Sequence, residues 1–516
     1  MVKSNEKFNE NLKLLAKTSI IVFFSVIFSK IFTYLYRIII ARSFGPEVYG
    51  ILTLSIMITG WFIALSSLGL NSGLARYIPL LRAKNKKTEI SFLFRNSLKL
   101  CFFSNIIICS LLIFFADKIA INIFHEPILT TFLRFFIISV PLTVFFELFL
   151  SIFVGYERIS SYSFFHKIIT GMVKVSLLVL FITIGMSYSS IYFSYLLSII
   201  IPFAIVIFLS ILMFPFIFDS KKKSSNKEKK LFSEMLSYSW PLMFYGFIWQ
   251  IFHWTDSFII GVFKTTTDVG IYNSAVQIAF LMTISSGLFI QLFFPMITRE
   301  FASGNKEIVK QLSKQVGKWI FFINLPMLLL LILYPDSFIQ FFFGKEYISA
   351  GNSLRFLGIG LFFFSIFEVS NKLISMRGKS KIVLMNIIIT SIFNIILNLI
   401  LISKYGITGV AFSTMLSFML LSCLFCLQSY RLYKIIPLRR KMLNLIFSSL
   451  ISAGILIFIK SFIPYNICSF LLLILTFSLL YIFFSFVFNA FDRHDFLIIK
   501  SLFKKMKTIS NFSYPE

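Results

Sequence analysis

Long apolar segments follow one another along almost the whole chain and are separated by short polar stretches. Each segment is close to the roughly 20 residues that a helix needs to cross the hydrocarbon core of a bilayer. The pattern therefore predicts an all-α polytopic membrane protein with fourteen transmembrane helices. We expect these spans at residues 18–41, 48–73, 95–116, 128–154, 162–184, 190–217, 238–262, 269–296, 318–335, 351–374, 382–402, 408–430, 442–461 and 467–489.

The composition supports a membrane protein. Of 516 residues, 58% are hydrophobic and only 14% are charged, and the mean hydropathy is +0.89. Soluble domains carry charge on about a quarter of their residues. The first apolar segment is too long for the core of a signal peptide and contains Lys30 and Arg37, so we interpret it as a membrane span.

The net charge of +28 is distributed unevenly along the chain. With the N-terminus inside, most of the 49 Lys and Arg residues fall in or beside the predicted cytoplasmic segments. This asymmetry is typical of a plasma-membrane protein and places both termini in the cytoplasm. It explains the basic excess without a nucleic-acid partner and favours contact with anionic membrane lipids.

The two halves of the chain repeat the same motifs in the same order, at an offset of 220 or 221 residues. The matching positions are Gly50 and Gly270, Asn85 and Asn305, Arg134 and Arg355, Glu147 and Glu368, Lys174 and Asn394, and Gly185 and Gly406. Because each half has six spans, an even number, both enter the membrane in the same orientation. The sequence thus predicts parallel repeats, whose interface usually holds the substrate site.

This repeat suggests a division into five parts. We expect a six-helix lobe at 1–218, a basic cytoplasmic linker at 219–235, a second six-helix lobe at 236–432, two further helices at 433–490 and a cytoplasmic tail at 491–516.

Four short motifs resemble a known transporter family. They are ARSFGPEVYG at 41–50, GLNSGLARY at 69–77, VGIYNSA at 269–275 and KYGITGVA at 404–411. Over residues 15–430 the chain resembles the polysaccharide and lipid-linked oligosaccharide branch of the multidrug/oligosaccharidyl-lipid/polysaccharide exporter superfamily, which includes O-antigen flippases. The resemblance implies two six-helix lobes around a central cavity, with two C-terminal helices. It also implies a flippase that moves an isoprenoid-diphosphate-linked glycan from the inner to the outer leaflet, with other membrane proteins of polysaccharide assembly as candidate partners.

Cations inside the first-half spans are the main candidates for substrate binding. Lys30 and Arg37 share one face of the first span, and Lys174 lies near the middle of the fifth. A lysine at the bilayer centre costs a few kcal/mol, so we expect these side chains to face a wet cavity that accepts an anion such as a diphosphate. For Arg134, substrate contact and snorkelling to the headgroups are both open.

The second half is neutral to acidic at the corresponding positions. Asn394, the counterpart of Lys174, belongs to a polar ladder that is suited either to sugar hydroxyls or to helix packing. Asp256 and His253 lie one turn apart, and we expect them either to carry a proton or sodium ion or, through an Asp256–Arg37 salt bridge, to close an outer gate.

Two glutamates complete the set of candidate coupling or gating residues. Glu147 has no basic neighbour in its own span, whereas Glu368 precedes Lys372 by four residues, so that an ion pair on the helix surface is the leading explanation for it.

Three functions compete. A flippase of lipid-linked oligosaccharides fits the cationic first half, and a multidrug or metabolite exporter coupled to an ion gradient is the alternative. A membrane-bound glycan polymerase or ligase needs a catalytic cluster on a large external loop, which the sequence does not offer. We expect no catalytic residue, metal site or cofactor.

Overall fold

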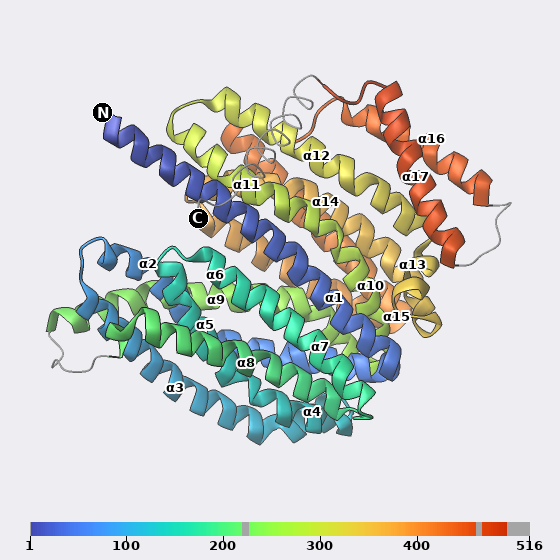
Figure 1. Cartoon of the computed structure of the whole chain (residues 1–516). Helices are drawn as coiled ribbons and strands as arrows, with labels where there is room; N and C mark the ends of the chain where they lie inside the picture. Colours follow the sequence, from blue (N-terminus) through green and yellow to red (C-terminus); the bar gives the residue numbers. More distant parts are fainter. Residues whose placement is uncertain (1, 219–225, 461–466, 493–516) are drawn as a thin grey trace. The chain divides into compact units, whose positions relative to one another are not determined.

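The computed structural model describes the backbone of residues 2–218, 226–460 and 467–492, and in these ranges the side chains from Ser25 onward, except those of Ile159, Leu292 and Ile467. All of the regular structure in these ranges is helical, in agreement with the predicted all-α class (Figure 1). The predicted C-terminal tail beyond Asp492 and residues 219–225 of the predicted linker lie outside the described residues. Residues 226–235 of that linker form the first turns of a long helix.

Seventeen α-helices and four short π or 3₁₀ segments make up the described part of the chain. Their bounds are α1 (Val2–Ser66), α2 (Leu70–Arg82), α3 (Lys87–Asp117), η1 (Lys118–Ile123), α4 (Pro127–Ile137), α5 (Ser139–Gly155), α6 (Ile159–Ser163), η2 (Phe164–Ile169), α7 (Thr170–Thr183), α8 (Ser189–Met213), η3 (Pro215–Ile217), α9 (Asn226–Phe263), α10 (Thr266–Phe280), α11 (Met282–Ala302), α12 (Lys306–Leu333), α13 (Pro335–Phe342), η4 (Lys345–Ala350), α14 (Gly351–Met376), α15 (Ser380–Tyr433), α16 (Met442–Lys460) and α17 (Ile467–Val487).

Ten helices of the described part are long and apolar enough to cross a membrane, and an eleventh is added if α10 and α11 count as one bent span. This number is lower than the fourteen spans predicted. Part of the difference arises because α1 and α15 each join two predicted spans. Gly45 interrupts α1 with φ 79° and ψ 177°, and Gly406 interrupts α15 with φ 57° and ψ −140°. The predicted boundary between two spans is therefore a kink in both helices.

The described residues form two compact units. The first contains residues 1–277, 342–353 and 387–414, and the second contains 278–341, 354–386 and 415–516. Since segments of the predicted second lobe belong to the first unit, the division at 218 and 432 remains a prediction.

The first unit has a core of large apolar side chains between α2, α3, α5 and α8. Phe94 of α3 and Phe149 of α5 meet edge to face with their ring centres 5.2 Å apart, and Leu74 and Val206 are fully buried beside them. Burying such side chains stabilises each contact by about 1.5–3 kcal/mol relative to water, although lipid reduces this difference for a membrane helix. The core holds the helices on which the charged residues lie.

In the second unit, α16 and α17 pack against each other as a hairpin, and α12 packs on both (Figure 1). Tyr481 of α17 donates a hydrogen bond to the carbonyl oxygen of Phe322 in α12 at 3.1 Å, and their rings stack at 5.3 Å. These contacts fix α17 on α12.

Candidate functional site

A group of cationic side chains gathers on one side of the first unit. Lys30 and Arg37 come from the first arm of α1, Lys167 from η2 and Lys174 from α7, and all four side chains are half-buried. Arg37 is close enough to Lys30 and Lys174 to act on both electrostatically, and Lys167 acts on Lys30 in the same way. We call Lys30, Arg37, Lys167 and Lys174 the cationic cluster.

Two tyrosines hold Lys174 in place. Its Nζ lies 4.1 Å from the ring centre of Tyr195 and 5.4 Å from that of Tyr36. Tyr36 in turn donates to the carbonyl oxygen of Ile191 at 3.1 Å, which links α1 to α8. Cation–π contacts of this kind stabilise a desolvated ammonium by about 1–2 kcal/mol while leaving its charge intact.

The cationic cluster is not neutralised within the described part of the chain. None of the ion pairs found there involves Lys30, Arg37, Lys167 or Lys174. Four like charges in a partly desolvated place repel one another, so the arrangement favours an anion that enters from outside the protein. Lysine and arginine are the usual ligands for phosphate oxygens.

A second polar group surrounds Asp256 of α9. Its Oδ2 accepts hydrogen bonds from the hydroxyls of Tyr272 at 2.5 Å and Thr414 at 2.7 Å. Its Oδ1 accepts one from the amide of Asn398 at 2.9 Å. Asn394 joins the group, because its amide donates to Thr414 and its oxygen accepts from Asn398. We call these five residues the Asp256 cluster.

His253 is oriented differently from Asp256. The charges that act on its ring are those of Arg37 and Lys30, so it faces the cationic cluster. Asp256 takes its hydrogen bonds from α10 and α15. Neither a His253–Asp256 pair nor an Asp256–Arg37 salt bridge is present among the described residues in this conformation.

The other predicted residues have local partners. Arg134 is exposed and forms an ion pair with Asp117 at 3.0 Å, which favours a surface role over substrate contact. Glu368 pairs with Lys372 at 3.7 Å, as its spacing indicates. Glu147 accepts a hydrogen bond from the amide of Asn71 at 2.9 Å.

Gly50 and Gly270 mark a close crossing of α1 and α10 within the first unit. A Cβ atom on Gly50 would lie 1.8 Å from the carbonyl oxygen of Thr266, and one on Gly270 would lie 1.9 Å from that of Pro46. The contact is reciprocal, since both pairs of positions differ by 220 in number. Only glycine permits this approach of the two backbones.

Sequence reasoning missed one pair of hydrogen bonds that follows the repeat. The Ser66 hydroxyl donates to the Asn105 side-chain oxygen at 2.8 Å in the first unit, and the Ser285 hydroxyl donates to that of Asn324 at 2.8 Å in the second. Both pairs are 39 residues apart, and they are offset by 219. A search for polar pairs at equal spacing in both halves would have found them.

A model of the family described as "Polysaccharide biosynthesis protein" matches residues 15–301, which is more than half of the chain. The chain belongs to this family. A model named MatE matches residues 241–400. The predicted resemblance to the polysaccharide branch of the exporter superfamily is confirmed.

Curated relatives resemble parts of the chain. The probable low-salt glycan biosynthesis flippase Agl15 of Haloferax volcanii is 23% identical over 48% of this chain and 52% of its own length. The lipid II flippase MurJ of Bacillus subtilis is 24% identical over 37% of both chains. A putative O-antigen transporter of Shigella flexneri is 26% identical over 31% of this chain and 37% of its own length. The chain thus spans about half or less of the curated relatives that it matches.

Solved structures match more of the chain. A lipid II flippase MurJ in an inward closed conformation superposes with a TM-score of 0.72 at 19% identity, over 91% of this chain and 98% of the other. A multidrug resistance MATE family transporter in an inward-facing conformation gives 0.68 at 15% identity, over 79% and 94%. At such identities the likeness shows the fold, which is that of a helical polytopic membrane transporter.

Proposed function

We propose that the protein is a flippase that moves an isoprenoid-diphosphate-linked oligosaccharide from the inner to the outer leaflet of the plasma membrane for the export of a cell-surface polysaccharide. The observation that carries this proposal is the cationic cluster, whose charges have no carboxylate partner in the described part of the chain. The names of the curated relatives, two glycan or lipid II flippases and an O-antigen transporter, support it.

The chemistry of the cluster suits a diphosphate. Arg37 offers a planar pair of N–H donors that can bind two phosphate oxygens, and Lys30 and Lys174 add mobile point charges. The amides and hydroxyls of the second half, Asn394 among them, suit neutral sugar groups. A substrate with one anionic end and a neutral polar body fits this asymmetry.

The proposed architecture has fourteen membrane crossings. The two arms of α1 and of α15 count separately, and α9 and the α10–α11 pair each add one crossing to the candidate spans. Six spans form each of two parallel lobes, α16 and α17 follow them, and both termini lie in the cytoplasm. The reciprocal Gly50–Gly270 contact and the paired Ser–Asn hydrogen bonds support an internal two-fold relation between the halves.

In the proposed mechanism the lobes rock about the substrate site, so that it opens first to the cytoplasmic side and then to the outer side. The protein lowers the barrier for the diphosphate by replacing its water shell with fixed cations. No covalent step is required of this transporter.

The test is a change of Lys30, Arg37 and Lys174 together to Gln. We expect the triple variant to lose at least about tenfold in export of the lipid-linked glycan, because each lost charge-assisted contact is worth about 1.5–3 kcal/mol. Export is measured as surface polysaccharide in a strain that lacks the native gene, with the amount of protein in the membrane measured in parallel.

A matched control changes three exposed cations, Lys84, Arg134 and Lys264, to Gln. This variant has the same net charge as the first triple variant and should export normally. Normal export by the cluster variant at a normal protein level would refute the assignment of the anion site.

A multidrug or metabolite exporter is the second candidate function. The MatE match covers residues 241–400, which include the buried carboxylate of Asp256. This alternative predicts that cells expressing the protein resist organic cations and that the cationic-cluster triple variant keeps this resistance.

A further inference from the structure

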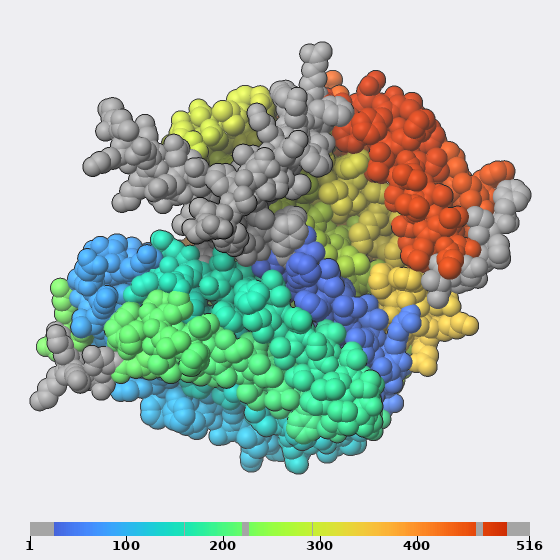
Figure 2. All heavy atoms as spheres, viewed as in Figure 1, coloured from blue at the N-terminus to red at the C-terminus, as the bar shows by residue number. Residues whose placement is uncertain are grey.

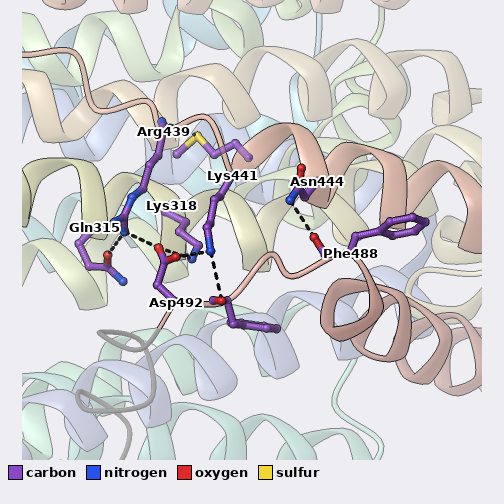
Figure 3. A network of polar contacts seen from close by, with 9 residues as sticks. Gln315, Lys318, Arg439, Lys441, Asn444, Phe488 and Asp492 are labelled. Atoms are coloured by element: carbon purple, nitrogen blue, oxygen red, sulfur yellow. Dashed lines mark hydrogen bonds and ion pairs between the residues drawn. The ribbon is translucent and has the colours of Figure 1, made fainter.

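The connection between α15 and α16 and the residues that follow α17 meet in one polar network of the second unit (Figure 3). The guanidinium of Arg439 lies 3.0 Å from the carboxylate of Asp492 and donates to the side-chain oxygen of Gln315 at 2.6 Å. Lys441 forms an ion pair with the same carboxylate, and Lys318 of α12 lies 3.7 Å from it. The network joins three separate segments.

This network carries more positive than negative charge. Arg439, Arg440 and Lys441 are consecutive, and Asp492 is the carboxylate that the described residues place beside them. Partial burial acts to raise the pKa of Asp492, but the hydrogen bond from Lys441 and the charges of Lys318, Arg439 and Lys441 outweigh it and lower that pKa. Asp492 is therefore ionised at neutral pH and offsets one of the three neighbouring charges.

Arg440 is placed differently from its two neighbours. Its side chain is exposed, and no ion pair or hydrogen bond of that side chain is found in the described part of the chain. The backbone carbonyl oxygen of Arg440 accepts a hydrogen bond from the N–H of Leu443 at 3.0 Å, so the residue stands at the start of α16. A free guanidinium at this point is available to an external anion.

Directly after Arg440, α16 presents an exposed apolar face. Leu443, Phe447 and Leu450 are 57%, 59% and 54% exposed, and their spacing puts them on the same side of the helix as Arg440. The 19 residues of α16 span about 28 Å, close to the roughly 30 Å of a bilayer core. Arg440 therefore lies at the level of the lipid headgroups, and the space-filling view shows α16 and α17 (red) with an outer surface of their own (Figure 2).

We propose that the start of α16 is a binding site for an anionic phospholipid of the bilayer. Arg440 binds the headgroup phosphate, Arg439 and Lys441 contribute the surrounding positive field, and the acyl chains lie along Leu443, Phe447 and Leu450. Basic sites at the ends of membrane helices bind anionic headgroups by this chemistry. The bound lipid balances the charge that Asp492 leaves uncompensated and holds α16 in place. The site depends on insertion in a membrane and is independent of the transported substrate.

The test uses the full-length protein in a mild detergent, titrated with phosphatidylglycerol or phosphatidylcholine and measured by native mass spectrometry. We expect selective binding of phosphatidylglycerol by the unchanged protein. Arg440→Gln should weaken that binding about fivefold, the effect of one arginine near a membrane surface. Since Arg440 is exposed, the variant should fold normally, which its thermal melting curve would show.

Arg377→Gln is the matched control, because Arg377 is an exposed arginine on the connection between α14 and α15. It should leave phosphatidylglycerol binding unchanged. Equal weakening by the two variants would mean that lipid is attracted to the surface in general, and equal binding of both lipids would mean that no anion site exists.

A further titration separates the phospholipid from a lipid carrier. Farnesyl diphosphate should fail to displace phosphatidylglycerol from the unchanged protein. Displacement that requires Arg440 would assign the site to the transported carrier and overturn the proposal.

Discussion

Asp256 is the residue whose surroundings carry the most specific information about energy coupling. Three donors from two other helices, Tyr272, Thr414 and Asn398, point at its carboxylate. The side-chain oxygen of Asn398 is itself buried and finds no hydrogen-bond partner among the described residues. We propose that this cluster takes up the coupling ion, either a proton on the carboxylate or a sodium ion among its oxygens. The proposal rests on the flippase function.

Asp256→Asn should uncouple transport from the ion gradient. An amide cannot accept a proton at this position and supplies one oxygen ligand fewer, so we expect the gradient-driven rate to fall about tenfold, within the usual range of coupling energies. The measurement is glycan flipping in vesicles with and without an imposed proton or sodium gradient.

Asp336→Asn removes an exposed acid at another position and serves as the control. It should keep the full response to the gradient. A response of Asp256→Asn equal to that of the unchanged protein would exclude this cluster from coupling.

Asp492 is a structural acid, and its effect should depend on pH. Asp492→Asn should lower the free energy of unfolding by about 1–2 kcal/mol at pH 7, because it removes one charge from a partly buried network. The pKa of Asp492 is lower in the folded protein than its ordinary value of 3.8, so its contribution is fully present above that value and is lost as the pH falls below it.

Melting temperatures in detergent at pH 7, 5 and 3 test this prediction. The difference between the two proteins should be the same at pH 7 and 5 and smaller at pH 3. The control Glu307→Gln breaks an exposed pair with Lys310 and should change little at any of them. A difference for Asp492→Asn that grows on acidification would contradict the stated direction.

The sequence identified the charged residues of the site better than their neighbours. Lys30, Arg37 and Lys174 are conspicuous because a charge in an apolar segment is costly, and the structure groups them in one unit. Tyr36 and Tyr195 could not be identified, since 20 tyrosines occur in the chain and nothing in their spacing distinguishes these two. The partners of Asp256 lie up to 158 residues away from it, and only the fold brings them together.

At the scale of helices, the crossing of α1 and α10 depends on two glycines. Gly50→Ala or Gly270→Ala would place a methyl group less than 2 Å from a backbone carbonyl oxygen, so the helices must separate. We expect each change to lower the free energy of unfolding by about 1–3 kcal/mol, as for overpacking in a core.

Gly246→Ala in α9 is the matched control, because no atom lies within 4 Å of the added carbon. Alanine has the higher helix propensity, so this change should be neutral or slightly stabilising. Thermal unfolding of the three variants in detergent checks the comparison, and equal melting temperatures would mean that the crossing has little energetic weight.

Helix boundaries were predicted well where polar residues or turns end an apolar segment. They were predicted less well at Gly45 and Gly406, where the chain bends without leaving its helical course for more than one residue. Hydropathy reports where a segment can lie in a bilayer, but it does not distinguish a kink from a loop. The predicted linker failed in part for a related reason, because its charged residues from Asn226 onward extend α9 beyond the membrane.

For the whole molecule, the proposed topology gives a direct test. Fusions of alkaline phosphatase, which is active only outside the cytoplasm, should be active after residues 186 and 405 and inactive after residues 85, 304 and 378. Fluorescent-protein fusions at the same five points should give the opposite pattern. Activity after residue 304 would contradict the parallel arrangement of the two halves.

The reciprocal contact of Gly50 and Gly270 also bears on the history of the chain. Each half uses the same short surface to touch the other, which is the rule for the interface of a symmetric dimer. A six-span ancestor with this surface would bind a second copy of itself through it. Gene duplication and fusion would then convert a dimer into one polypeptide, after which each copy was free to acquire its own charge: cations in one, amides and an acid in the other.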